Sequence, residues 1–294
     1  MIIVMFYIDL YVTSHRQGKI GLKSSLIWSG VWITCALLFN IIIFFFLEDG
    51  KTKAIEYLAG YLVEKSLSVD NLFVFIMIFN VLGIKDHNQP HVLKWGIISA
   101  IAMRIVFILA GITLINLFHP IIYFFGALLI YASYHMAFGK DEEIDLKKNP
   151  VVKFASKYFN IATDYTGNRF FTKKDGKFFV TQLFIALLLV ESADVVFNID
   201  SIPAVIAITS DPFIVITSNV FAILGLRALY FALAALVDLF VYLKYGVSMI
   251  LAYVGVKMLI TDLYAIPTPI SLAVILVCLA LSIVLSLMKT KKQV

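Results

Sequence analysis

Residues 54–80 read AIEYLAGYLVEKSLSVDNLFVFIMIFN, and residues 180–208 read VTQLFIALLLVESADVVFNIDSIPAVIAI. Each run is long and apolar enough to cross a bilayer, because about 20 helical residues span a hydrocarbon core of roughly 30 Å. Each run also carries acidic and amide side chains, although a charge at mid-membrane costs about 2.5 to 3.5 kcal/mol. These stretches therefore predict two membrane helices that hold a functional polar site.

The composition extends this prediction to the whole chain. Of its 294 residues, 61% are hydrophobic and 15% are charged, and the mean hydropathy is +0.95. These values exclude an ordinary soluble protein and predict one all-α, polytopic transmembrane domain over residues 1–294. The apolar runs predict nine helices, at residues 1–12, 26–47, 54–80, 95–116, 119–138, 180–208, 213–237, 243–262 and 268–288.

The distribution of basic residues predicts how the helices are oriented. Lys51 and Lys53 are the only Lys or Arg residues in the predicted loops on one side, and the other side holds many. Because basic loops stay in the cytoplasm, we expect the N-terminus outside and the C-terminus inside. The net charge of +5 therefore reflects topology, and no nucleic-acid partner is expected.

One long connection, residues 139–179, is rich in lysine and aromatic residues. We expect it on the cytoplasmic side. A basic, aromatic segment beside an anionic leaflet is typical of a loop that rests on lipid headgroups, and a partner-binding role is the alternative.

The chain also predicts an internal repeat. Glu64, Ser68, Asp70 and Asn71 share their spacing with Asp194, Asn198, Asp200 and Ser201. Arg104 and Arg227 each follow in the next apolar run. We therefore predict a duplicated three-helix unit, residues 54–138 and 180–262, whose copies cross the membrane in opposite directions, as in many secondary transporters.

The acidic residues of the two copies predict the substrate site. At 100° per residue, Glu64, Ser68 and Asn71 lie within about 60° of one another on one helix. Likewise Glu191, Asp194, Asn198 and Ser201 lie within about 80° on the other. Asp70 and Asp200 lie about 120° from these stripes, and we expect Pro203 to open its helix locally and expose carbonyl ligands beside Asp200.

A site of carboxylate, amide and hydroxyl oxygens suits a hard divalent cation, and the residue chemistry does not choose among Mn²⁺, Mg²⁺ and Ca²⁺. The predicted ligands are Glu64, Asp70, Asn71, Glu191, Asp194, Asn198, Asp200 and Ser201, with Arg104 and Arg227 as counter-charges. Structural pairing of these acids with Lys65, Arg104 and Arg227 is the alternative. Asn40 and Asn219 are interpreted as interhelical hydrogen-bonding residues.

The segments 56–75, 189–204 and 209–227 resemble the signature runs of the TerC family, and the similarity covers nearly the whole chain. The start departs from it, because family members have a fuller first helix. The resemblance implies a bacterial cytoplasmic-membrane protein related to LysE-type exporters, linked to tellurite resistance and Mn²⁺ efflux. It implies that Glu64, Asp70 and Asn71 belong to the first acidic motif and that Glu191, Asp194, Asp200 and Ser201 belong to the second.

Two hypotheses follow. The first is a secondary transporter that exports Mn²⁺ by alternating access, driven by proton exchange, with the ion as substrate and no prosthetic group. The second is a membrane scaffold of a tellurite or metal resistance complex that docks partners on residues 139–179. An enzyme is not expected, because no GxGD-type protease motif accompanies the intramembrane acids. Self-association and complex partners stay open.

Overall fold

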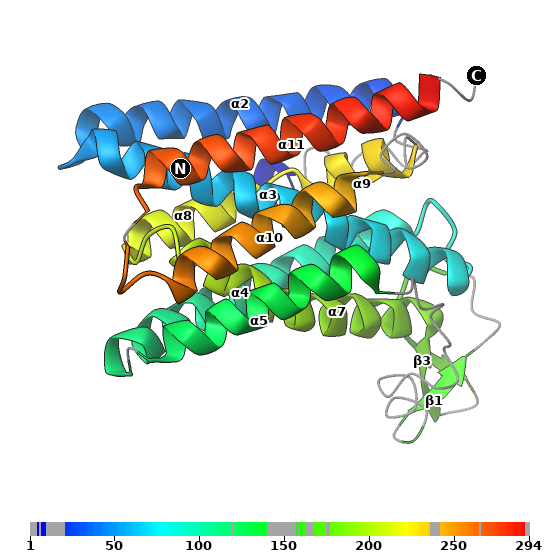
Figure 1. Cartoon of the computed structure of the whole chain (residues 1–294). Helices are drawn as coiled ribbons and strands as arrows, with labels where there is room; N and C mark the ends of the chain where they lie inside the picture. The colour runs from blue at the N-terminus through cyan, green and yellow to red at the C-terminus, as the bar shows by residue number, and fades with distance from the viewer. Residues whose placement is uncertain are drawn as a thin grey trace.

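The computed structural model describes residues 5, 7–9, 21–118, 120–139, 157, 159–162, 167–174, 177–235, 242–264 and 266–291. The side chains of Asp70 and Asp200 lie outside the described part, although both residues belong to helices. Long helices lie side by side in one bundle, with a small sheet at one end (Figure 1).

The helices are α2 (Leu22–Phe46), α3 (Gly50–Val81), α4 (Gln89–Leu117), α5 (Ile121–Phe138), α7 (Gln182–Ile206), α8 (Pro212–Ile223), α9 (Leu226–Ala234), α10 (Leu243–Leu259) and α11 (Thr268–Lys291). By length and composition, α2, α4, α5, α7 and α11 can each cross a membrane, and α8 with α9 can form a sixth, bent span. Two other helices of the bundle differ from these spans. The helix α3 carries more charged residues than they do, and α10, with 17 residues, is shorter. The prediction of an all-α membrane protein is confirmed, and the count of nine spans stays a prediction.

The outer surface of the bundle is apolar. Phe45 and Phe46 at the end of α2 are 72% and 81% exposed, and most of the exposed large side chains of α11 are aliphatic. Such a surface is unfavourable in water and matches the hydrocarbon of a bilayer.

Two predicted helices differ from the structure. Of the predicted helix 1–12, the described residues 7–9 form a helical turn, and most of the others lie outside the described part. The predicted helix 213–237 is two helices, because the chain bends by 43° between α8 and α9. Gly225 occupies this break with a φ of 77°, and a Cβ atom there would collide with the indole of Trp32. Glycine is therefore required at the break.

The expectation that Pro203 opens its helix is wrong for the backbone. The helix α7 continues through Pro203 to Ile206, and the amide of Ala207 donates to the carbonyl of Pro203. Proline removes only its own hydrogen bond to the carbonyl of the residue four positions earlier, and the neighbouring bonds hold the helical path.

In its described residues, the connection between α5 and α7 contains three strands, which were not predicted. They are β1 (Asn160–Ala162), β2 (Phe171–Lys174) and β3 (Lys177–Thr181). Their order is β1-β3-β2, with β1 parallel and β2 antiparallel to β3. Since β3 leads directly into α7, the sheet lies at the end of the bundle where α7 begins (Figure 1).

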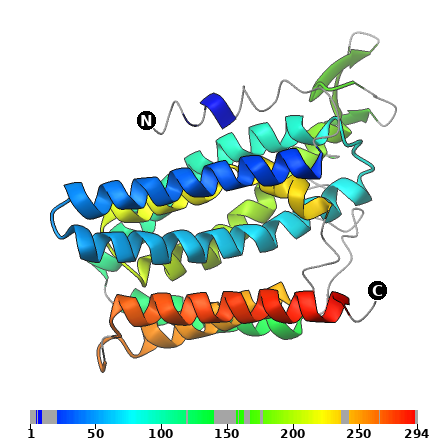
Figure 2. The ribbon, with the colours of Figure 1, turned by 90° about the horizontal axis from the view of Figure 1, so that it is seen from above.

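Small residues bring α5 and α10 into close contact. Gly126 faces Gly255, and the Oγ of Ser133 donates to the carbonyl of Ser248 at 2.8 Å. Residue numbers increase from Gly126 to Ser133 along α5 and decrease from Gly255 to Ser248 along α10, so the two helices run antiparallel. Figure 2 shows α11 on the α10 side of the bundle and α2 beside α3 on the other.

Contacts between the predicted repeats also fix the direction of the other helices. Gly96 on α4 faces Val190, and Gly111 faces Ile202, both on α7, so α4 and α7 run parallel. Gly60 on α3 likewise faces Ser218 on α8. A short turn joins α3 to α4, so α3 and α7 run in opposite directions, as the sequence predicted for the acidic helices. The sequence duplication itself stays a prediction.

The α5–α10 contact gives a stability prediction. Gly255→Leu is expected to lower the melting temperature of the detergent-purified protein by several degrees, because its Cβ alone would lie 2.9 Å from the carbonyl oxygen of Gly126. Differential scanning fluorimetry measures this. Gly30→Leu on α2 is the matched control, since a Cβ at Gly30 has no neighbour within 4 Å. Equal melting temperatures for the two variants would contradict the close packing.

Candidate functional site

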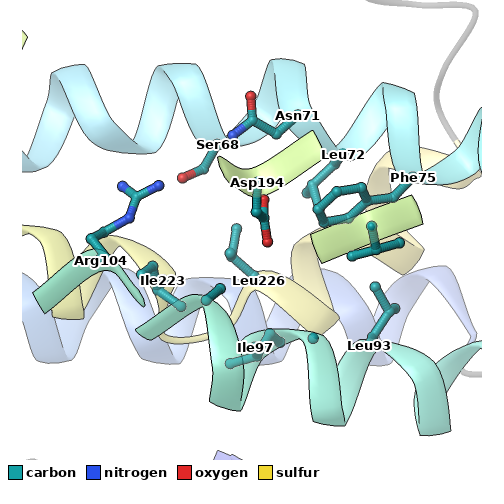
Figure 3. A pocket seen from close by; sticks show the side chains of 13 residues that line it. Ser68, Asn71, Leu72, Phe75, Leu93, Ile97, Arg104, Asp194, Ile223 and Leu226 are labelled. Atoms are coloured by element: carbon teal, nitrogen blue, oxygen red, sulfur yellow. The ribbon is translucent and has the colours of Figure 1, made fainter. Parts of the chain in front are cut away.

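A small cavity lies inside the bundle where α3, α4, α7 and the α8–α9 break meet. Its volume is about 20 Å³, which is enough for one water molecule, since a single water requires about 10 to 15 Å³. Its polar lining consists of Ser68 and Asn71 from α3, Arg104 from α4 and Asp194 from α7, which surround the same space in Figure 3. Its other lining residues are Leu72, Phe75, Leu93, Gly96, Ile97, Ala100, Val190, Ile223 and Leu226.

A buried ion pair adjoins this cavity. Glu64 is 0% exposed, and its Oε1 contacts the Nη1 of Arg104. The hydroxyl of Ser68 donates to the same oxygen at 3.1 Å. Arg104 also donates to the Oδ1 of Asn219 at 3.1 Å, which joins α4 to α8 and confirms Asn219 as an interhelical hydrogen-bonding residue. The pair therefore holds three helices together beside the cavity.

The ion pair leaves hydrogen-bonding capacity unused. The Oε2 atom of Glu64 and the Nε atom of Arg104 are buried and have no hydrogen-bond partner within the described part of the chain. Buried polar atoms of this kind are uncommon, because an unpaired group loses its hydration without compensation. The free carboxylate oxygen is therefore a candidate ligand atom.

Asp194 points into the cavity opposite α3 (Figure 3). It is 7% exposed and forms no hydrogen bond or ion pair among the residues that the structure describes. Arg104, Glu191 and Glu64 all lie within electrostatic range of its carboxyl group. Glu64 pairs with Arg104 and Asp194 lies nearby, so two carboxyl groups from antiparallel helices lie close to one guanidinium group beside the cavity.

Glu191 lies one turn before Asp194 on α7. Its Oε1 accepts a hydrogen bond from the hydroxyl of Ser99 on α4. A Cβ atom at Gly96, which lines the cavity, would lie 3.6 Å from the same oxygen. Glu191 is therefore a neighbour of the cavity but not part of its lining.

The remaining predicted residues divide into three groups. Asn198 and Ser201 are 1% exposed on α7, and their side-chain polar atoms have no hydrogen-bond partner in the described structure, but they do not line the cavity. The side chains of Asp70 and Asp200 lie outside the described residues. Arg227 lies near Asp9, with 4.0 Å between its Nε and a carboxylate oxygen, and away from the lining of the cavity.

Among the described residues, no three His, Cys, Asp or Glu side chains converge as a preformed metal site. The described cavity instead combines one carboxylate with an amide and a hydroxyl, and Glu64 lies behind it. An ion there would draw most of its ligands from neutral oxygens or water.

Sequence reasoning missed the contacts of three residues near the site. Ser99 resembles an ordinary helix serine, and nothing in its spacing pointed to Glu191. Asp9 lies in a short apolar run, and a single acidic residue in such a run could have indicated a buried, paired carboxylate. Lys65 was left without a role, and its ammonium group binds carbonyls at the α8–α9 break.

Comparison with known proteins gives consistent matches. Residues 49–294 match the model of the "Integral membrane protein TerC family". An uncharacterized membrane protein of Myxococcus xanthus is 42% identical over 290 residues, which cover 99% of this chain and 90% of that protein. The "Putative membrane-bound redox modulator Alx" of Escherichia coli (strain K12) is 40% identical over 293 residues, covering 97% and 91%.

An uncharacterized membrane protein of Rickettsia bellii is 40% identical over 289 residues, which cover 98% of this chain and 95% of that protein. No solved structure matches the chain. The family model covers the acidic helices, Arg104 and the α8–α9 break, and the relatives align over almost their whole length. The chain therefore belongs to the TerC family of integral membrane proteins.

Proposed function

We propose that this protein is a secondary transporter that exports a hard divalent cation from the bacterial cytoplasm, with Mn²⁺ as the first candidate. The observation that carries this proposal is the proximity of Asp194, which lines a small internal cavity, to the Glu64–Arg104 pair from neighbouring helices. Acidic residues within membrane helices are costly and commonly mark the pathway of an ion or a proton.

The oxygen donors favour this substrate class. Asp194, Asn71 and Ser68 offer carboxylate, amide and hydroxyl oxygens at the cavity, and among the described residues no cysteine or histidine lines it. Oxygen sites select Mg²⁺, Ca²⁺ and Mn²⁺ over softer metals. The volume of about 20 Å³ suits an ion with little water and excludes an organic solute in this conformation.

Transport would proceed by alternating access, with proton exchange as the driving reaction. When the metal leaves, Glu64 and Asp194 would be left with one guanidinium group between them, and a proton taken up by either would remove the excess charge. The sequence prediction of a cytoplasmic C-terminus and an external N-terminus belongs to this proposal, and it sets the direction of export.

Flux into proteoliposomes tests the proposal. We expect the purified protein to move Mn²⁺ at a rate that increases with an imposed pH gradient, and excess Mg²⁺ or Ca²⁺ to compete if the oxygen ligands alone set selectivity. A metal-quenched dye inside the vesicles measures the rate, and protein-free vesicles are the control. Equal flux in both preparations would reject the transporter.

The name of the Escherichia coli relative suggests a redox role as an alternative. In the described structure Cys35 on α2 and Cys278 on α11 are both free cysteines, and neither lines the cavity. A scaffold for a resistance complex is the other alternative. Deleting residues within 139–179 would then abolish resistance while flux in vesicles persists, which separates it from transport.

A further inference from the structure

Lys65 has an unusual set of partners. It follows Glu64 on α3, but its Nζ lies at the break between α8 and α9, where it donates to the carbonyl oxygens of Ala222 at 3.0 Å and Leu224 at 3.4 Å. Both acceptors are main-chain atoms. The ammonium group is therefore held by the backbone of a broken helix.

The break explains why these carbonyls accept a cation. The last four carbonyls of a helix lack helical partners, and α8 ends at Ile223. The left-handed Gly225 then redirects the chain into α9. In the middle of a bundle no bulk water is present to satisfy these groups, so they require another donor or an ion. Discontinuous membrane helices commonly place such carbonyls around a transported or coupling cation.

A carboxylate completes the surroundings of Lys65. Asp9 is 1% exposed, and both Lys65 and Arg227 lie within electrostatic range of it. Arg227 is the second residue of α9, so the anion and both cations surround the same break. Carbonyl oxygens with a carboxylate nearby favour a cation, and the single charge of the ammonium group at this position matches that of a monovalent ion.

We propose that the α8–α9 break is a monovalent-cation site whose occupant is the tethered ammonium group of Lys65. The site therefore stays filled without Na⁺ or K⁺, and the bend between the two helices is held by the protein itself. This inference goes beyond the proposed transport of a divalent metal, and its test reads stability, so the two fail independently.

Removing the tether should create a requirement for a free cation. Lys65→Ala is purified in detergent, and its melting temperature is measured in NaCl, KCl and choline chloride at equal ionic strength. We expect the wild-type protein to melt at one temperature in all three salts. The variant should melt several degrees lower in choline and regain most of that loss in NaCl or KCl.

Lys257→Ala is the matched control. Lys257 is also a half-buried helix lysine, but its Nζ donates to the hydroxyl of Ser271 and not to helix-end carbonyls. We expect no selective effect of Na⁺ or K⁺ on this control. If Lys65→Ala cannot be purified, Lys65→Ser is measured instead, because its hydroxyl adds one ligand for the free ion.

The proposal is overturned if the Lys65 variant that is measured melts at the same temperature in all three salts. It is also overturned if the Lys257 control gains as much from Na⁺ or K⁺ as Lys65→Ala does. Failure to recover either Lys65 variant in any salt counts against it too, since a free cation would then be unable to replace the ammonium group.

Discussion

Asp194→Asn is expected to reduce Mn²⁺ flux in proteoliposomes on the order of 100-fold, because even indirect partners of metal sites contribute 10- to 100-fold to affinity. The substitution keeps the size of the side chain and removes the charge. Since Asp194 lacks a hydrogen bond or ion pair in the described structure, its loss should not lower the melting temperature. A loss of transport with retained stability would identify Asp194 as a ligand.

Asp262→Asn is the control for this variant. Asp262 is exposed at the end of the bundle, where it accepts a hydrogen bond from the hydroxyl of Tyr123 at 2.6 Å. Its substitution should leave the flux unchanged. Full Mn²⁺ flux by Asp194→Asn would show that the cavity is not the substrate site.

Arg104→Met is expected to be the most destabilising single change. It leaves the fully buried side chain of Glu64 without its counter-charge, and breaking a buried pair in this way costs about 3 to 5 kcal/mol. It also removes the hydrogen bond to Asn219. A large decrease in melting temperature, measured by fluorescence in detergent, is the expected result.

The double variant Arg104→Met with Glu64→Gln separates charge from packing. A neutral glutamine needs no counter-charge, so the double variant should recover most of the lost stability and remain inactive in Mn²⁺ flux. If the double variant is no more stable than Arg104→Met alone, packing and not the uncompensated charge explains the loss.

Local chemistry made much of the site predictable. Glu64, Ser68, Asn71 and Asp194 were predicted as polar stripes on two helices, because helical periodicity converts spacing directly into a shared face. The structure brings them together with Arg104 beside one cavity. It does not bring Asn198, Ser201 or Arg227 into the lining of the cavity. Periodicity predicts which side of a helix a residue lies on, but not which other helix packs against that side.

The sequence by itself determined that the chain is helical and lies in lipid, since long apolar runs can satisfy their backbone in a membrane only as helices. It also determined which helices carry the acids and that these helices run in opposite directions. Only the tertiary structure decided that the bend falls at Gly225 and not at Pro203, that Glu64 pairs with Arg104, and that Lys65 binds the broken helix. These outcomes depend on which side chains from distant segments meet in space, and local spacing carries no information about that.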